Sequence, residues 1–217
     1  MHKNYLYAAV VLSVLINSSC SGQENNSNEP GDIPMKDVNI KLDTATFGAG
    51  CFWCVEAIFQ NLEGVYAVTA GYSGGHTKNP TYKEVCDGGT GHAEVAQITY
   101  DPQKISFEEL LDVFWKTHDP TTLNRQGHDV GEQYRSVIFY HNEAQKAAAE
   151  KSRNEMDASG YFDFPIVTAI EPLTNFYKAE DYHQDYFKYN PSQPYCIAVI
   201  KPKVDKFKKE FKDKLKK

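Results

Sequence analysis

The stretch of sequence that decides the fold joins a predicted strand to a predicted helix and reads Gly50-Cys51-Phe52-Trp53-Cys54-Val55-Glu56. Residues 44–48 before it are strand-like and end in glycine. After it, apolar residues recur at the helical spacing i, i+3, i+4 and i+7, as Val55, Ile58, Phe59 and Leu62. Cys51 therefore falls between a glycine-ended strand and the first turn of a helix, where free N–H groups and the helix dipole stabilise an anion. We expect this position to favour the Cys51 thiolate.

Cys51 and Cys54 admit three interpretations, because a thiolate is both a nucleophile and a metal ligand. A structural zinc site needs four ligands; His92 and His128 could complete one, but their spacing does not demand it and no second Cys-x-x-Cys is present. A thioredoxin-like oxidoreductase usually carries a proline between its cysteines, whereas Phe-Trp stands here. The third interpretation is a nucleophilic Cys51 in an aromatic pocket, with Cys54 near enough to form a disulfide later.

Outward from this stretch, strand and helix signals are mixed along the chain. β-branched and aromatic runs predict further strands at residues 65–70, 95–100, 135–140 and 166–170. Gly64 is placed to cap the first helix, and residues 71–79 have the composition of a loop. A second helix should begin at Ser106 with a capping box. A third should run from Asn142 to Gly160.

The C-terminal segment shows a one-sided apolar stripe that we expect to pack on the sheet: Val204, Phe207, Phe211 and Leu215. Its lysines are interleaved with acidic residues, so we interpret the polar side of residues 201–217 as a solvated helix face. Helices join some strands and loops join others, which favours an α+β fold. We predict a mixed sheet with a split βαβ (ferredoxin-like) core, covered by helices and followed by the C-terminal helix.

The N-terminal region differs from the rest of the chain. Residues 1–20 have the outline of a secretory signal peptide, with an apolar run too short to span a bilayer comfortably. Cys20 resembles the acylated cysteine of a bacterial lipoprotein, although Asn17 departs from the usual pattern; a cleaved signal with an incidental cysteine is the alternative. Residues 21–42 are poor in large apolar groups and predict a flexible tether. This leaves residues 43–217 for a single folded domain.

The overall charge restricts the class of partner. The chain has 217 residues and a formal net charge of −6, whereas nucleic acid binding requires a basic face that displaces counterions from phosphates. Aromatic residues make up 13% of the chain, which is high for a soluble domain and suits a pocket lined by rings. We therefore expect no nucleic acid partner.

Six motifs together resemble one family, the A-type peptide methionine sulfoxide reductases. Gly-Cys-Phe-Trp at residues 50–53 is similar to its signature. The others follow in the family's order over residues 44–202: Gly71-Tyr72-Ser73-Gly74-Gly75 with Pro80-Thr81-Tyr82; Gly91-His92-Ala93-Glu94-Val95; residues 126–136; Ala179-Glu180-Asp181-Tyr182-His183-Gln184; and Asn190-Pro191 with Gln193-Pro194-Tyr195. One such motif would be weak, but six in order are specific.

The resemblance implies a role for each matching residue. Cys51 would attack the sulfoxide sulfur, and Glu94 would protonate the oxygen, which requires a secluded carboxyl with a raised pKa. Tyr82 and Tyr134 would donate hydrogen bonds to the same oxygen, and Asp129 would organise the site. An apolar notch would hold the substrate methyl group and select the S epimer of the sulfoxide; its two rings are Phe52 and Trp53.

The same resemblance implies that attack leaves Cys51 as a sulfenic acid, which a second thiol must clear. Many family members carry glycine at the position of Cys54 and use cysteines in a glycine-rich C-terminal tail, which this chain lacks. Cys54 is therefore the first candidate for the resolving thiol and Cys196 the second, whereas Cys86 is expected to be buried and inert. A thioredoxin-like reductant would then reduce the disulfide, without metal or organic cofactor.

If Cys20 ends a lipoprotein signal peptide, we expect the protein in the bacterial cell envelope, periplasmic or at the surface, held at the membrane by its lipid anchor alone. The expected substrates are oxidised proteins or peptides, and nothing in the sequence requires more than a monomer. An oxidising compartment opposes thiol regeneration, so a dedicated envelope reductant is expected. The alternative in another class is a binding module whose cysteines are structural, which predicts a permanent disulfide and no turnover.

Overall fold

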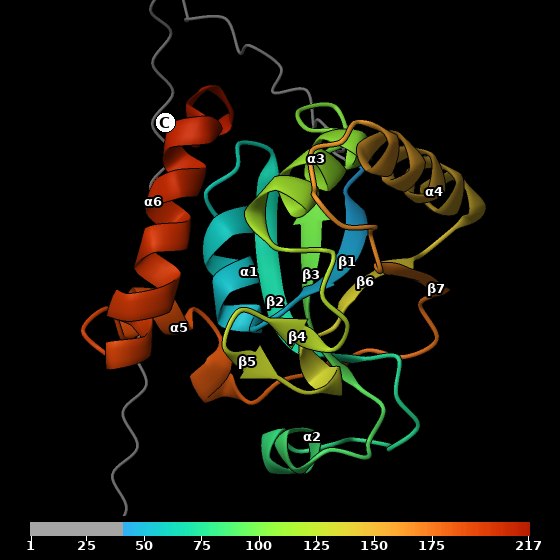
Figure 1. Cartoon of the computed structure of the whole chain (residues 1–217). Helices are drawn as coiled ribbons and strands as arrows, with labels where there is room; N and C mark the ends of the chain where they lie inside the picture. Colours follow the sequence, from blue (N-terminus) through green and yellow to red (C-terminus); the bar gives the residue numbers. More distant parts are fainter. Residues whose placement is uncertain (1–40) are drawn as a thin grey trace, which may run out of the picture. The chain divides into compact units, whose positions relative to one another are not determined.

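The computed structural model describes residues 41–217 (Figure 1). The predicted signal peptide, Cys20 and the tether as far as residue 40 lie outside these residues. No helix between residues 41 and 217 is both long enough and apolar enough to cross a membrane.

A six-stranded sheet has the order β7-β6-β1-β3-β2-β8. Its strands are β1 (Asp43–Ala49), β2 (Val65–Ser73), β3 (Ala93–Tyr100), β6 (Ser136–Tyr140), β7 (Ala169–Pro172) and β8 (Tyr177–Lys178). β3 is antiparallel to both β1 and β2, so β1 and β2 are parallel to each other, with β3 between them. Helix α1 (Phe52–Phe59) connects β1 to β2, and α3 (Phe107–Thr117) connects β3 to β6 around β1 in the same way. These are two split βαβ units, so the predicted ferredoxin-like core is confirmed.

The main core lies between the sheet and the two crossover helices, which Figure 1 shows on the same side of the sheet. Phe47 of β1 contacts aromatic rings from both helices, with ring centroids 5.7 Å from Phe59 and 5.1 Å from Phe114. A smaller apolar cluster around Val95 and Phe139 is packed against Leu173 and Phe176. Because both crossover helices are held by this core, the start of α1 is a rigid platform.

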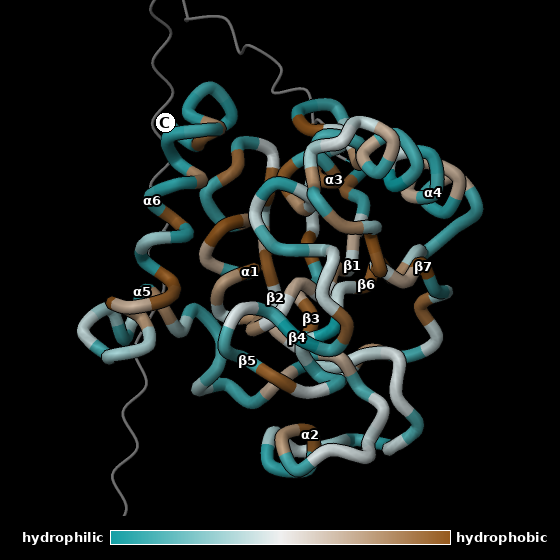
Figure 2. Tube along the Cα trace, in the orientation of Figure 1, coloured by the Kyte–Doolittle hydropathy of each residue, from teal (hydrophilic) through white to brown (hydrophobic). Residues whose placement is uncertain are grey.

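Two outer helices complete the helical layer. α4 (Glu143–Ala158) begins at the predicted cap, where Asn142 Oδ1 accepts a hydrogen bond from the Gln145 N–H at 2.9 Å. α6 (Lys201–Glu210) buries Val204 and Phe207, but it packs on α1 rather than on the sheet (Figure 1), so that expectation was wrong. Figure 2 shows its apolar residues alternating with hydrophilic ones. The predicted amphipathic stripe is confirmed by the burial of Val204 and Phe207, but the element that it packs against is α1 and not the sheet.

Three local predictions differ from the structure. α1 ends at Phe59, and Gly64 instead forms the turn into β2 with φ 85°, which glycine adopts without strain. β2 continues to Ser73 into the predicted loop, and β7 begins at Ala169, three residues after the predicted start at Ile166. Several elements are too short to show a periodicity and were not predicted: α2 (Tyr82–Asp87), β4 (Arg125–Gln126), β5 (Asp129–Val130), α5 (Tyr186–Tyr189) and a π-helical turn (Cys196–Ile200).

Candidate active site

Cys51 occupies the N-cap position of α1, directly after the sharp turn at Gly50, whose φ is 86°. The Cys51 carbonyl accepts a hydrogen bond from the Cys54 N–H at 3.0 Å, which places Cys54 in the first turn of the same helix. Both cysteines are buried, and Cys51 retains 6% exposure. Their side chains are hydrogen-bonded to each other. The turn therefore brings two thiols together at one helix end.

The two thiols of this pair differ in their surroundings. Burial raises the pKa of Cys51 well above its usual value, and the hydrogen bond to Cys54 and the Glu94 charge act in the same direction. The hydrogen bond with Cys51 lowers the pKa of Cys54, against the effect of burial and with help from the Lys203 charge. Of the two thiols, Cys54 therefore loses its proton more readily in this arrangement. The sequence prediction of a thiolate at Cys51 considered the helix end alone, whereas burial and Glu94 act against that charge.

Glu94 lies at the second residue of β3 and is 1% exposed. Its Oε2 accepts the Phe52 N–H at 3.0 Å, so the carboxyl lies against the helix end that carries Cys51. Burial raises the pKa of Glu94 to about 8, while the Phe52 hydrogen bond opposes this shift and the Asp129 charge adds to it. The carboxyl is therefore mostly protonated at neutral pH, as the role of a proton donor requires.

Tyr82 and Tyr134 reach the same region from two of the unpredicted short elements. Tyr82 is the first residue of α2, and its ring stacks on Phe52 with centroids 6.4 Å apart. Tyr134 ends a single 3-10 turn (Glu132–Tyr134). Burial raises the pKa of both phenols, and the nearby Glu94 charge raises each further. Both hydroxyl groups thus keep their protons and remain hydrogen-bond donors near Glu94.

Asp129 opens β5 and is joined to the thiol pair by a residue to which the sequence assigned no role. Its Oδ2 accepts the Tyr195 hydroxyl at 2.7 Å. Tyr195 is also hydrogen-bonded to the Cys51 sulfur, which opposes the rise in the pKa of Cys51. The predicted residue Asp129 therefore meets Cys51 through Tyr195. The only signal for Tyr195 was its position in a family motif directly before Cys196.

The aromatic wall of the site contains more residues than the predicted Phe52 and Trp53. Phe52 is fully buried, whereas Trp53 is half-buried and donates its indole N–H to His183 Nδ1 at 3.1 Å. The Trp53 ring also stacks on Tyr186, with centroids 3.8 Å apart and an interplanar angle of 9°. His183 and Tyr186 come from the segment around α5, which has no periodic pattern in the sequence.

The remaining cysteines of the described chain differ in exposure. Cys86 is exposed on α2 and hydrogen-bonded to the Tyr82 hydroxyl, so the expectation of a buried, inert thiol was wrong. Its helix is short and buries Val85, while the next residue, Cys86, faces outward. Cys196 is fully buried at the start of the π-helical turn. Burial raises its pKa, and the charge of Cys54 adds to this.

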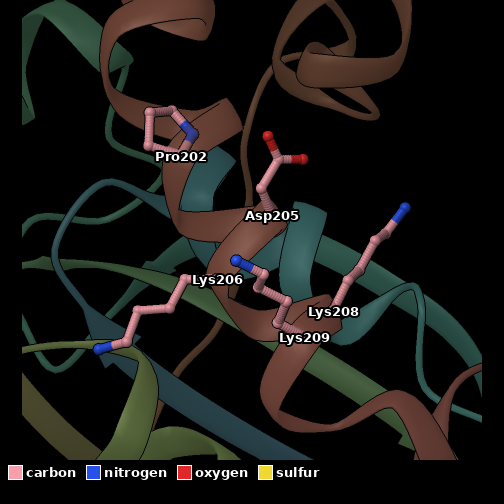
Figure 3. Close-up of a pocket in the computed structure, with 5 residues that line it drawn as sticks. All are labelled: Pro202, Asp205, Lys206, Lys208 and Lys209. Atoms are coloured by element: carbon pink, nitrogen blue, oxygen red, sulfur yellow. The ribbon is translucent and has the colours of Figure 1, made fainter.

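Two other features of the described residues bear on where a site lies: the histidines and acidic groups that could bind a metal, and a hollow on α6. No cluster of three or more histidine, cysteine or acidic side chains suited to a metal ion occurs within residues 41–217. His92, a candidate zinc ligand, is instead hydrogen-bonded to the Thr77 carbonyl at 2.7 Å. An open hollow on α6 carries only polar groups and proline, and no thiol (Figure 3): Pro202, Asp205, Lys206, Lys208 and Lys209. The chemistry of the described chain is therefore concentrated at the start of α1.

Comparison with known proteins identifies the family of this chain. Residues 43–215 match the family model described as peptide methionine sulfoxide reductase. The chain is 57% identical over 168 residues to peptide methionine sulfoxide reductase MsrA of Leptospira borgpetersenii, a match that covers 77% of this chain and 94% of that protein. For MsrA 1 of Rhodopirellula baltica the identity is 58%, over 80% of this chain and 90% of the relative.

Solved structures give the same result. The reduced form of Mxr1 from Saccharomyces cerevisiae is similar with a TM-score of 0.66 and 38% identity, covering 72% of this chain and 90% of that one. Methionine sulfoxide reductase A of Corynebacterium diphtheriae has a TM-score of 0.62 and 37% identity, covering 69% and 76% of the two chains. The chain therefore belongs to the A-type peptide methionine sulfoxide reductases and is an oxidoreductase that reduces methionine sulfoxide.

Proposed function

We propose that Cys51 attacks the sulfur of methionine-S-sulfoxide in peptides or proteins, with Glu94 as the acid. The observation that carries this proposal is the contact of the Glu94 carboxyl with the Phe52 N–H at 3.0 Å, because it holds a protonated acid beside the buried Cys51. Tyr82 and Tyr134 supply two further donors to the oxygen. No other group of described residues combines a thiol, an acid and neutral donors.

In the first step the sulfoxide oxygen passes from the substrate sulfur to the sulfur of Cys51. A bond forms between Cys51 and the substrate sulfur, while Glu94 gives a proton to the oxygen and the Cys54 thiolate accepts the proton of Cys51. The oxygen then moves to Cys51 as the new bond breaks. Methionine and a Cys51 sulfenic acid result, so the methionine sulfoxide is reduced by two electrons and Cys51 is oxidised by two. Phe52 and Trp53 bind the methyl group opposite the donors, and this arrangement selects the S epimer.

In the second step Cys54 resolves the sulfenic acid, forming a disulfide with Cys51 and releasing water. Cys54 is preferred over Cys196 because it already contacts Cys51 and has a lowered pKa, whereas the pKa of Cys196 is raised by burial. A dithiol of the thioredoxin type then reduces the disulfide and is itself oxidised. The electrons of the cycle are thus supplied by the dithiol, without a metal or an organic cofactor.

We also propose that the enzyme is an exported monomer, anchored in the bacterial envelope by lipid on Cys20. The support is the signal-like sequence of residues 1–20 and the polar stretch that follows. A cell that incorporates labelled palmitate into the wild type but not into Cys20→Ser, and releases the variant from membranes, would agree with this. Release of both proteins would favour the cleaved signal peptide instead.

The test of the reaction is single-turnover reduction of a peptide that carries methionine-S-sulfoxide. Cys51→Ser should form no methionine, while a variant without its resolving thiol should form one equivalent and then stop before the disulfide. The R epimer should remain unreduced. If Cys51→Ser forms methionine at the normal rate, the nucleophile is misassigned and the cysteines are structural, as the binding-module alternative predicts.

A further inference from the structure

Glu56 is a buried carboxyl that the proposed reaction does not use. It lies on α1, one residue after Val55, and only 1% of its surface is exposed. Its Oε1 accepts the Asp185 N–H at 2.9 Å, and its Oε2 accepts the Tyr186 N–H at 3.3 Å. Both oxygens are therefore occupied by consecutive backbone groups of a segment about 130 residues further along the chain.

The backbone that Glu56 holds adopts a conformation that needs support. Asp185 has φ 52°, in the left-handed region that a non-glycine residue rarely enters. Gln60, one helical turn after Glu56, donates its side-chain N–H to Asp185 Oδ1 at 2.9 Å. Gln184, the residue before Asp185, is bound to β2. Its side-chain oxygen accepts the Ala70 N–H, and its side-chain nitrogen donates to the Ala70 carbonyl. One face of α1 and one sheet strand therefore hold this turn.

The turn ends in Tyr186, whose ring lies flat on Trp53 at 3.8 Å. Trp53 and Glu56 are three residues apart on α1, so the helix presents the indole and also holds the backbone that carries its stacking partner. A shift of the turn would move Tyr186 and leave one face of Trp53 unsupported. The substrate wall then depends on a residue that does not itself face substrate.

We propose that Glu56 is a positioning residue for the substrate pocket, and that Gln60 assists it. By holding the Asp185–Tyr186 turn, Glu56 keeps the Tyr186 ring against Trp53 and so sets the shape of the methyl-binding side. This inference rests on the proposed role of Trp53 in the preceding section. It predicts that the loss of Glu56 weakens substrate binding more than it slows the chemistry at Cys51.

The experiment compares Glu56→Leu, Glu56→Gln and wild type with a methionine-S-sulfoxide peptide. Glu56→Leu should raise KM roughly tenfold with kcat within about twofold, because a displaced wall affects binding and not the acid or the nucleophile. Glu56→Gln keeps one acceptor oxygen and should lie between the two. Gln60→Met should also raise KM, by a smaller factor. This variant replaces Glu56→Leu in the test if Glu56→Leu does not fold.

Two measurements separate positioning from general loss of stability. In a Tyr186→Leu background, Glu56→Leu should add little to KM, because both changes act on the same contact. Trp53 emission should shift to the red in Glu56→Leu, while Trp115 stays buried with its N–H on Ser152 Oγ at 2.8 Å. Gln145→Leu is the matched control: Gln145 is also buried and donates to the Thr44 carbonyl at 2.8 Å, so it should lower Tm without changing KM.

An unchanged KM and emission spectrum in folded Glu56→Leu, with only Tm lowered, would overturn this proposal and leave Glu56 as a structural cap. Additive effects of Glu56→Leu and Tyr186→Leu on KM would do the same. Failure of the proposed reaction is a separate outcome, since it would appear as normal methionine formation by Cys51→Ser.

Discussion

The start of α1 and the segment from Tyr177 to Ile200 build the same site in different ways. The first lies between long elements of the core, β1, β3 and α1, and provides the groups proposed to react, Cys51 and Glu94. The second consists of short elements held by polar side chains, and it provides walls and a further thiol. The reactive groups therefore lie on the core, while the shape of the pocket depends on hydrogen bonds between residues that are far apart in the sequence. Variants in the two regions should therefore fail differently.

The largest effect is expected on the core side, from Glu94→Gln. An amide of the same shape cannot supply the proton, so the single-turnover rate at pH 7 should fall by roughly 10²- to 10⁴-fold. In the wild type, activity should decline as pH rises through about 8, because the pKa of Glu94 is raised to that value by burial. A stopped-flow profile from pH 6 to 9 should lose this decline in the variant. An unaltered profile would remove Glu94 from the reaction.

Much of this core side could be predicted from the sequence. The strand, glycine turn and helix around Cys51 follow from a periodic pattern that extends over whole turns, and the capping box at Ser106 was likewise found in the structure. The partner of α6 could not be predicted, since an amphipathic stripe shows that a face is buried but not against what. The raised pKa of Cys51 could not be predicted either, because its burial and its neighbour Glu94 depend on tertiary packing.

The short segments were harder to predict, and the reason is physical. α5 has four residues and is held by Glu56 from α1, so no local pattern announces it. His183 and Tyr195 stood in recognised motifs, but their contacts with Trp53 and Asp129 join residues far apart in sequence. Cys86 was expected to be buried as a small apolar group, but on the short helix α2 it is Val85 that faces the core, and Cys86 is exposed.

Each region contains one candidate for the resolving thiol, Cys54 at the start of α1 and Cys196 in the second segment, and the second prediction distinguishes them. Cys54→Ser should form one equivalent of methionine and then accumulate a sulfenic acid, detected by mass after dimedone treatment. Cys196→Ser should still form the disulfide between Cys51 and Cys54, because Cys54 lies in the same helical turn as Cys51 and has a lowered pKa, whereas burial raises the pKa of Cys196. The reverse pattern would transfer the resolving role to Cys196 and to the less rigid segment.

The third prediction concerns Tyr195, which connects the two regions. Tyr195→Phe removes the hydroxyl that bonds Asp129 at 2.7 Å and the Cys51 sulfur, so the pKa of Cys51 should rise further. A rise of about one unit would slow the single-turnover rate roughly tenfold at neutral pH. Tyr100→Phe is the matched control, since its hydroxyl also meets a carboxylate, Asp43, but outside the site. Equal effects of the two variants would deny Tyr195 a specific role.

The last prediction concerns stability rather than activity, and it tests the core side alone. The pKa of Glu94 is raised from 4.5 to about 8 in the folded chain, so the folded state binds this proton more tightly than the unfolded state. The stabilisation is complete below pH 4.5 and is lost as pH rises to about 8. Glu56, with a pKa raised to about 7 by burial, acts with the same sign.

Glu94→Gln has no such proton to lose, so above pH 8 it should be more stable than wild type by on the order of 2 kcal/mol, discounted from 1.36 kcal/mol per unit of pKa. Urea unfolding at pH 5 and pH 9 measures this difference, which should nearly vanish at the lower pH. A variant that is inactive yet more stable would show that the buried acid is kept for its chemistry, at the expense of the core that surrounds it. A variant less stable than wild type at pH 9 would mean that the Phe52 hydrogen bond outweighs burial.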